Sequence, residues 1–373
     1  MKEFMTFKSG KFYFSEKYDA HRINTLLIRA NVLNETVVDL PILPELASQI
    51  EPEIMYSSIS GTAAIEGNPI TKDDIRKLAE GEDIEKYTKK DKLEITNLLK
   101  AYNLLSQVEA DDKPILLSEK LILDIHLIIT NGLTDGQNVP GQYRNGLVHV
   151  SDQAHGGVYT PPRILADIES LMKEFIVWIN SNACLKLDPF IRSAIAHYYF
   201  CLIHPFWDGN GRTGRLIEAI LLQSAHIKYV PKILSNFYYR NVDDYYLAFS
   251  RAIKLKKDIT PFLEFILKAA ISSLDEIKGS IIYFIRKFSL REYYFLKKRE
   301  KAITTRQFDL LSMLLDNPIG FTLKDLIELR PFSFLYNKTS VQTARRDIKK
   351  LTDLKLLQIK PDGKCFLNLR ALG

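Results

Sequence analysis

Apolar residues recur every three to four positions over most of the chain, which is typical of helices that bury one face. The clearest segments are 93–105, 117–129, 164–179, 190–203, 245–253 and 262–277. Stretches rich in proline or glycine interrupt this pattern at 41–44, 132–140 and 156–162. The pattern therefore predicts a mainly α protein.

The C-terminal residues follow a different order of short elements. They are an amphipathic helix at 308–315, a helix that begins after Thr322, a helix at 339–351, and two β-prone runs at 356–359 and 365–369. Three helices followed by a hairpin resemble a winged helix-turn-helix. In that interpretation the residues that face a DNA major groove are Ser340, Gln342, Thr343, Arg345 and Arg346. A protein–protein or dimerisation role is equally open.

Composition adds limits to this picture. A chain of 373 residues exceeds the usual size of one hydrophobic core, so two or three domains are expected. Apolar content of 46% and charged content of 26% are ordinary for a folded soluble protein. The sequence has no apolar run of transmembrane length and no signal peptide, and its three cysteines are scattered, so we expect a cytoplasmic protein without membrane contact. The net charge of +6 is mild and does not by itself indicate a nucleic-acid partner.

The segment 204–215 reads His-Pro-Phe-Trp-Asp-Gly-Asn-Gly-Arg-Thr-Gly-Arg and precedes an apolar, helix-like run at 216–222. Glycine tolerates positive φ, so Gly209 and Gly211 can turn consecutive backbone N–H groups toward an anion. The N-terminus of the following helix also favours negative charge. This combination predicts a phosphate-binding loop.

Side chains of matching chemistry flank that loop. Arg212 and Arg215 lie three residues apart, on one helix face, and guanidinium forks suit phosphate oxygens. Asp208 supplies an oxygen of the kind that Mg²⁺ accepts, and a neutral His204 imidazole can take a proton from a hydroxyl. Each residue alone has an ordinary structural explanation, but together they predict a nucleotide-polyphosphate site with a general base.

The same segment matches the Fic family signature, His-x-Phe-x-Asp/Glu-Gly-Asn-Gly-Arg-x-x-Arg, at every fixed position, and so the chain resembles that family. The resemblance implies a mainly α fold, with a Fic-type helical bundle, a small β-hairpin flap and the C-terminal winged helix-turn-helix. It also implies an enzyme that uses ATP and Mg²⁺ to transfer AMP to a Ser, Thr or Tyr hydroxyl of a target protein. Two alternatives stay open: a nucleotide-sensing transcriptional regulator and a Doc-like protein kinase. Gly211, where such kinases usually have lysine, argues against the second, and the intact His204 argues against the first.

Carried over by position, the family's roles fall on named residues. His204 would be the general base and Asp208 the metal ligand. Asn210 would hold the α-phosphate together with the Gly209 and Gly211 backbone, and the two arginines the outer phosphates. The ATP site implied by the resemblance comprises Glu66, Asp208, Gly209, Asn210, Gly211, Arg212, Thr213, Gly214, Arg215 and Tyr245. Tyr245 would border the adenine or, equally, pack in the core as an aromatic of an amphipathic helix.

Residues 57–68 resemble the family's inhibitory helix, Ser/Thr-x-x-x-Glu-Gly/Asn. Thr62, Glu66 and Gly67 occupy its fixed positions, and the resemblance implies that Glu66 pairs with Arg215 and denies it to the γ-phosphate of ATP. An ordinary helix end at a glycine is the alternative interpretation.

Two β-prone runs, at 141–150 and 156–162, with a polar, glycine-rich turn between them predict a hairpin. In the family such a flap binds the target segment by adding a strand to its edge. The residues implied are Val148, His149, Val150, Val158 and Tyr159. A plain surface hairpin is the alternative.

These predictions divide the chain into four parts. They are an N-terminal helical region at 1–110, a catalytic core at 111–275, a connecting helix at 276–301 and the winged-helix-like domain at 302–373. Expected partners are ATP and a target protein, whereas a DNA or protein partner of the C-terminal part and a homodimer stay open.

Overall fold

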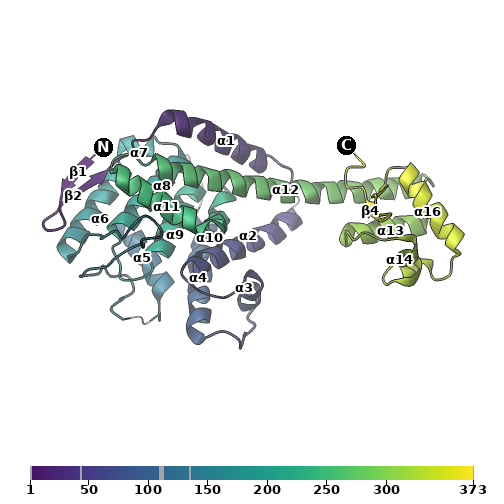
Figure 1. Cartoon of the computed structure of the whole chain (residues 1–373), viewed down its shortest axis with the longest axis horizontal. Helices are drawn as coiled ribbons and strands as arrows, with labels where there is room; N and C mark the ends of the chain where they lie inside the picture. The colour runs from purple at the N-terminus through teal and green to yellow at the C-terminus, as the bar shows by residue number, and fades with distance from the viewer. Residues whose placement is uncertain (1, 43, 109–112, 134–135, 373) are drawn as a thin grey trace. The chain divides into compact units, whose positions relative to one another are not determined.

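The computed structural model describes residues 2–42, 44–108, 113–133 and 136–372. It divides the chain into two compact units, Met1–Ile277 and Lys278–Gly373. Helices dominate both units, as the sequence pattern predicts, and strands form only two small sheets (Figure 1). Within the described residues, none of the helices combines the length and the apolar character needed to span a membrane.

The first unit contains every long apolar segment that the periodicity predicts as helical. Its elements are β1 (Lys2–Met5), β2 (Lys11–Phe14), α1 (Ala20–Val38), α2 (Pro44–Ile65), α3 (Lys72–Ala79), α4 (Lys89–Gln107), α5 (Glu119–Thr130), α6 (Leu165–Ile179), α7 (Asn182–Leu185), α8 (Pro189–Ile203), α9 (Asn210–Ser224), η1 (Val230–Lys232), α10 (Leu234–Arg240), α11 (Val242–Leu255) and the start of α12 (Thr260–Arg299).

The core of this unit is the pair α8 and α9. Almost every residue of both helices is buried, which is expected of a helix surrounded by other helices. Gly214 allows the close approach, because a Cβ there would lie 3.0 Å from Cys201 Sγ and 3.1 Å from His197 Cδ2. The residues at the start of α9 are thereby fixed relative to the end of α8.

Helix α2 packs along α10, and this contact fixes the position of its C-terminal end. A Cβ on Gly61 would lie 2.6 Å from the Ser235 backbone oxygen, so only glycine permits this spacing. Gly67, at φ +88°, ends the helix as the sequence predicts. The last turn of α2 therefore lies beside the start of α9.

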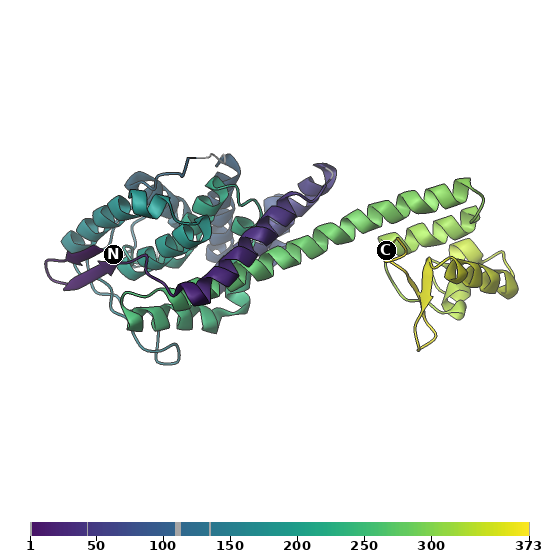
Figure 2. The same cartoon turned by 90° about the horizontal axis from the view of Figure 1, so that it is seen from above.

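The N-terminal β1–β2 hairpin and α1 complete the first unit. Phe14 is fully buried and stacks on Trp178 of α6 at 5.2 Å between ring centroids. Helix α1 runs beside the first part of α12, where Arg22 pairs with Glu264 at 2.6 Å (Figure 2). The sequence analysis did not predict these elements.

The second unit has the element order expected of its sequence. Its elements are the rest of α12, α13 (Thr305–Asp316), α14 (Leu323–Glu328), α15 (Ser333–Tyr336), α16 (Val341–Asp353), β3 (Leu357–Ile359) and β4 (Cys365–Leu367). Thr322 caps α14 by accepting from Asp325 N, as predicted, and β3 pairs antiparallel with β4. The short α15 was not predicted.

Two predicted boundaries need comment. The connecting helix at 276–301 is not a separate element, because the apolar segment before it continues into α12 without a break. The predicted boundary at 110/111 lies outside the described residues.

Candidate active site

The loop 204–209 joins α8 to α9 and carries the first site residues. His204 ends α8 in the left-handed region, at φ 50° and ψ 60°, which is rare for a residue with a Cβ. Gly209 has φ +79°, as predicted for an anion-binding loop. Gly211 is helical instead, so that part of the prediction is wrong. Glycine leaves room here for the neighbouring ion pair, since a Cβ would lie 2.6 Å from Glu66 Oε1 and 2.9 Å from Arg215 Nη1 and would displace these side chains.

Buried contacts make this loop rigid. Phe206 is fully buried and stacks on His126 of α5 with 3.6 Å between ring centroids. His126 Nε2 donates to the Asp208 carbonyl at 3.0 Å, because its Nδ1 already accepts from a backbone N–H. Asn210 uses its amide to accept from Phe206 N at 2.9 Å and donate to Phe206 O at 2.8 Å. The Asn210 side chain therefore closes the loop, and the phosphate role implied for it stays a prediction.

One ring nitrogen of His204, Nδ1, contacts the backbone, and the other, Nε2, can accept a proton. Nδ1 lies 3.3 Å from the Cys201 carbonyl, which can only accept, so Nδ1 carries the proton and Nε2 the lone pair. Burial, together with the positive charge of Arg144, lowers the pKa of His204 to about 4. The imidazole is therefore neutral at physiological pH, as a general base requires.

Arg144 supports His204 from behind. It is fully buried, and its Nε donates to the His204 carbonyl at 2.7 Å while Nη2 donates to Pro162 O at 2.6 Å. Burial lowers the pKa of Arg144 to about 10. This guanidinium holds the backbone at the left-handed residue and adds positive potential beside the imidazole.

Arg215, on α9, is held by the end of α2. Its Nη2 donates to Glu66 Oε1 at 2.6 Å, and its Nε donates to Thr62 Oγ1 at 2.7 Å. The Arg215 side chain is almost completely buried, whereas that of Glu66 is 30% exposed. The pair that the sequence predicts is present, and it occupies the guanidinium edge that a phosphate would need.

Arg212 has different partners. Nη1 pairs with Glu94 of α4, and Nη2 donates to both Asp208 oxygens at 2.8 and 2.7 Å. Glu94 Oε2 also accepts from Asn68, just beyond α2, at 2.9 Å. Glu94 therefore links the end of the predicted inhibitory segment to the signature, a connection that the sequence analysis missed.

A buried polar network lies behind Arg215. His197 Nε2 contacts the Tyr245 hydroxyl at 2.9 Å, and Nδ1 lies 3.0 Å from Glu218 Oε2. Burial opposes a charge on His197, but the Glu218 carboxylate outweighs it and raises the pKa to about 9. Tyr245 is buried and stacks on Tyr238 at 5.0 Å, as the packing alternative expects. It also lines the pocket described below, so its place beside the adenine stays a prediction.

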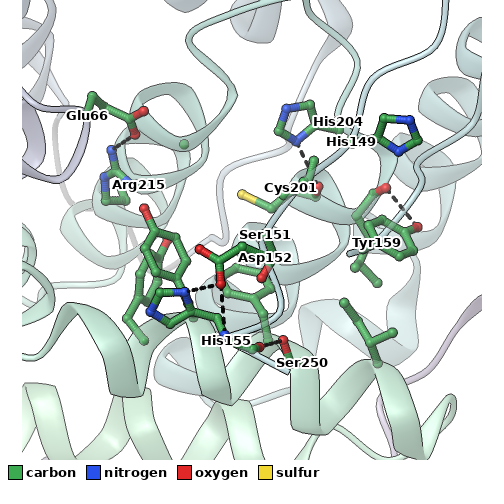
Figure 3. Close-up of a pocket in the computed structure, with 17 residues that line it drawn as sticks. Glu66, His149, Ser151, Asp152, His155, Tyr159, Cys201, His204, Arg215 and Ser250 are labelled. Carbon is green, nitrogen blue, oxygen red and sulfur yellow. Dashed lines mark hydrogen bonds and ion pairs between the residues drawn. The ribbon is translucent and has the colours of Figure 1, made fainter. Parts of the chain in front are cut away.

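His204, Arg215 and Glu66 line one pocket of about 440 Å³, a volume in the range of small-ligand sites (Figure 3). The predicted residues that line it are Glu66, His149, Val150, Tyr159, His204, Gly211, Arg215 and Tyr245. The predicted residues outside its lining are Thr62, Gly67, Val148, Val158, Asp208, Gly209, Asn210, Arg212, Thr213 and Gly214. Thr213 is fully buried, and Gly214 faces α8. Both residues therefore lie on sides of α9 that point away from the pocket.

The flap closes one side of the pocket with a single bridge rather than two strands. Val150 and Tyr159 exchange backbone hydrogen bonds of 2.9 and 2.8 Å. His155 fastens the turn, because its ring bonds to Asp152 at 2.8 Å and to Asp243 of α11 at 3.1 Å. His155 is therefore partly buried in the turn of the flap, whereas His149 is exposed.

Comparison with known proteins agrees with this geometry. Residues 116–222 match the profile of the Fic/DOC family, and the match ends within α9. This segment is therefore similar to a Fic domain. It includes the loop, both signature arginines and the flap, while Glu66 and Glu94 precede it.

Curated proteins that are similar to this part of the chain are named protein adenylyltransferases. The chain is 30% identical over 231 residues to the Protein adenylyltransferase Fic of Drosophila yakuba, a match that covers 60% of this chain and 42% of that protein. It is 32% identical over 129 residues to Protein adenylyltransferase fic-1 of Caenorhabditis elegans, covering 35% of this chain and 24% of that protein. The chain thus spans less than half the length of these relatives.

Solved structures share the fold. A Fic family protein from Desulfovibrio desulfuricans G20 superposes with a TM-score of 0.60 at 20% identity, over 95% of this chain and 98% of that chain. Residues 134–508 of Fic-1 from C. elegans superpose with a TM-score of 0.57 at 23% identity, over 70% of this chain and 73% of that chain. At these identities the likeness establishes the architecture alone.

Proposed function

We propose that the chain is an ATP-dependent protein adenylyltransferase that transfers AMP to a Ser, Thr or Tyr hydroxyl of a target protein. The observation that carries this proposal is the convergence of His204 Nε2 and the Arg215 guanidinium on one pocket, at the end of α8 and the start of α9. The names of the relatives of the Fic domain support the same reaction.

In this reaction the target hydroxyl oxygen attacks the α-phosphorus of ATP. A new P–O bond forms to the target, the bond from the α-phosphorus to the bridging oxygen breaks, and pyrophosphate leaves. His204 Nε2 accepts the hydroxyl proton. A pKa of about 4 makes the free imidazole a weak base, but the negative phosphates of bound ATP would raise that pKa toward the working range.

The start of α9 and its arginines would hold the polyphosphate. The helix N-terminus at Asn210 directs backbone N–H groups and a positive dipole end toward an anion. Arg215 would bind the outer phosphate once its partner on α2 withdraws, and Arg212 would act from beside Asp208.

Asp208 is the residue that would hold Mg²⁺. Its side chain is 40% exposed, and its carboxylate is ionised because Arg212 outweighs burial and lowers its pKa. The described residues offer no cluster of three acidic, histidine or cysteine ligands, which fits an ion held by one carboxylate plus substrate phosphates. When bound, Mg²⁺ would neutralise charge that develops on pyrophosphate.

Glu66 would keep the enzyme inactive by occupying Arg215. Removing Glu66 would free the guanidinium for the γ-phosphate, so that ATP settles with its α-phosphorus in line for attack. The backbone of Val150 is already paired with Tyr159, so the target segment would pair with the flap at its exposed neighbours His149 and Ser151, a contact that requires little side-chain specificity.

The test uses Glu66→Gly with ATP labelled at either the α- or the γ-phosphate, and a mixture of cellular proteins as acceptors. We expect α-label on protein, released pyrophosphate and a requirement for Mg²⁺. Glu66→Gly/His204→Ala serves as the control and should transfer no label. Transfer of γ-label would instead establish a kinase, and binding of ATP without transfer of either label would support a nucleotide sensor.

A further inference from the structure

The second unit carries a cationic surface that AMP transfer does not use. Residues 278–373 contain 20 Lys and Arg against 9 Asp and Glu, a formal charge of +11, whereas residues 1–277 contain 31 against 36, a charge of −5. The mild net charge of the whole chain hides this asymmetry. Such a division of charge within one chain points to a polyanionic partner for the basic part.

The cations concentrate on one face of α16. Ala344, Asp347, Ile348 and Leu351 are buried and define the inner face of the helix. The opposite face presents Gln342, Arg345, Arg346 and Lys349, all exposed. Three cations and one amide make up this outer stripe, with the half-exposed Val341 at its N-terminal edge, whereas a protein interface is usually apolar at its centre.

A buried acidic residue fixes the orientation of α16. Asp347 accepts from Gln307 Nε2 at 2.7 Å, from Arg306 Nε at 2.9 Å and from the Tyr336 hydroxyl at 3.1 Å. Ser340 caps the helix by accepting from Thr343 N. The outer stripe therefore projects from a rigid element, as a surface that reads a shaped partner must.

The cations of this stripe and the adjacent Lys350 also form no ion pairs within the described residues. In the part of the chain that the structure describes, no acidic side chain forms an ion pair with Arg345, Arg346, Lys349 or Lys350. The nearest buried acid, Asp347, is already used by Arg306. Unpaired guanidinium and ammonium groups keep their full attraction for phosphate.

The order of elements fits duplex DNA in particular. α13, α14, the short α15, α16 and the β3–β4 hairpin follow one another, and a bridge joins Phe321 to Cys365. Apart from the four-residue α15, this is the order of winged helix-turn-helix domains, in which the helix at the place of α16 enters the major groove. Lys360 and Lys364 are exposed at the hairpin turn, where a wing would meet the backbone of the DNA.

We infer that the second unit binds double-stranded DNA, with the outer face of α16 in the major groove and the β3–β4 turn along the phosphate backbone. Arg345, Arg346 and Lys349 supply the electrostatic part of this binding, and Gln342, in the first turn of the helix, faces base edges. This activity is separate from AMP transfer and uses none of its residues.

The test measures the affinity of the full-length protein for a fluorescein-labelled duplex of mixed sequence, by fluorescence anisotropy, across a range of salt concentrations. Arg345→Ala/Arg346→Ala should weaken binding about tenfold or more and reduce the slope of log K against log salt by about 2, since each lost phosphate contact lowers the slope by about one. Arg286→Ala/Arg299→Ala removes two exposed cations from the same unit and should change affinity less than about twofold.

Three results would overturn the inference. They are wild-type protein that does not bind the duplex even at low salt, equal losses in the two double variants, and capture of a specific protein through the same α16 stripe without DNA. Selection from a randomised duplex pool adds a second measurement. Gln342→Ala should alter the enriched sequence, and an unchanged sequence would contradict the placement of α16 in the major groove.

Discussion

The two units of this chain use charged side chains in opposite ways. In the first unit the functional charges are buried and paired: Arg215 with Glu66, Arg212 with Glu94 and Asp208, and His197 with Glu218. In the second unit Arg345, Arg346 and Lys349 are exposed and unpaired within the described residues. Buried charges need exact partners and so set geometry and switching, whereas exposed charges keep their long-range field for a large partner.

The largest effect that separates the units should come from His204→Ala. In a Glu66→Gly background it should lower AMP transfer by a factor on the order of 10²–10⁴, because a general base is lost. ATP binding and duplex binding should stay within about twofold. Steady-state transfer assays and the anisotropy titration check this, and a parallel loss of duplex binding would mean that the two units are not independent.

Removing one member of a buried pair should be far more costly than removing one member of an exposed pair. His197→Gln leaves the Glu218 carboxylate buried without its cation and should lower the free energy of unfolding by about 3–5 kcal/mol. Asp275→Asn breaks an exposed pair with Arg29 and should change it by at most about 1 kcal/mol. Both pairs lie in the first unit, so denaturant unfolding of the two variants compares buried with exposed charges inside one unit, and similar values would contradict the claim that only the buried charges need their partners.

The converse test changes the second unit and measures the activity of the first. Arg345→Ala/Arg346→Ala should keep AMP transfer within about twofold of its parent while it loses duplex affinity about tenfold. A transfer assay on the same protein preparation checks this. A matched loss of both activities would show that α16 supports the catalytic unit.

The pH dependence should reveal the environment of His204. Because its pKa is about 4, the imidazole loses the ability to accept a proton only as the pH falls toward 4, not through 6.5. For Glu66→Gly we expect kcat/KM for ATP, which reports the groups of the free enzyme, to show no fall from the titration of His204 between about pH 5.5 and 7.5. A fall centred near the ordinary histidine pKa would contradict the buried environment of this ring in the free enzyme.

The sequence predicted much of this molecule, and its failures have physical causes. Apolar periodicity located α4, α5, α6, α8 and α11 but missed α1, and turn chemistry located Thr322, Gly67 and Gly209. Gly211 was predicted to need positive φ, but it needs space beside Glu66, and a sequence does not show which distant side chain approaches a glycine.

The same cause explains why the sequence analysis missed some site residues. Glu94 and Arg144 lie far from the signature in sequence and reach it only through tertiary packing. His197 lies in an apolar helix, where a histidine is more often a packed residue than part of a network, and only the contact with Glu218 of α9 distinguishes the two. The charge asymmetry needed the boundary at Ile277, since the whole-chain charge concealed it.

The central claim is that Glu66 competes with the γ-phosphate of ATP for Arg215. Isothermal titration of wild type and Glu66→Gly with ATP and with ADP, at equal Mg²⁺, tests it most directly. We predict that Glu66→Gly improves the affinity for ATP about tenfold, in line with a charged hydrogen bond of about 1.5–3 kcal/mol, and that it improves the affinity for ADP much less. An equal change for the two nucleotides, or no change for either, would contradict the claim.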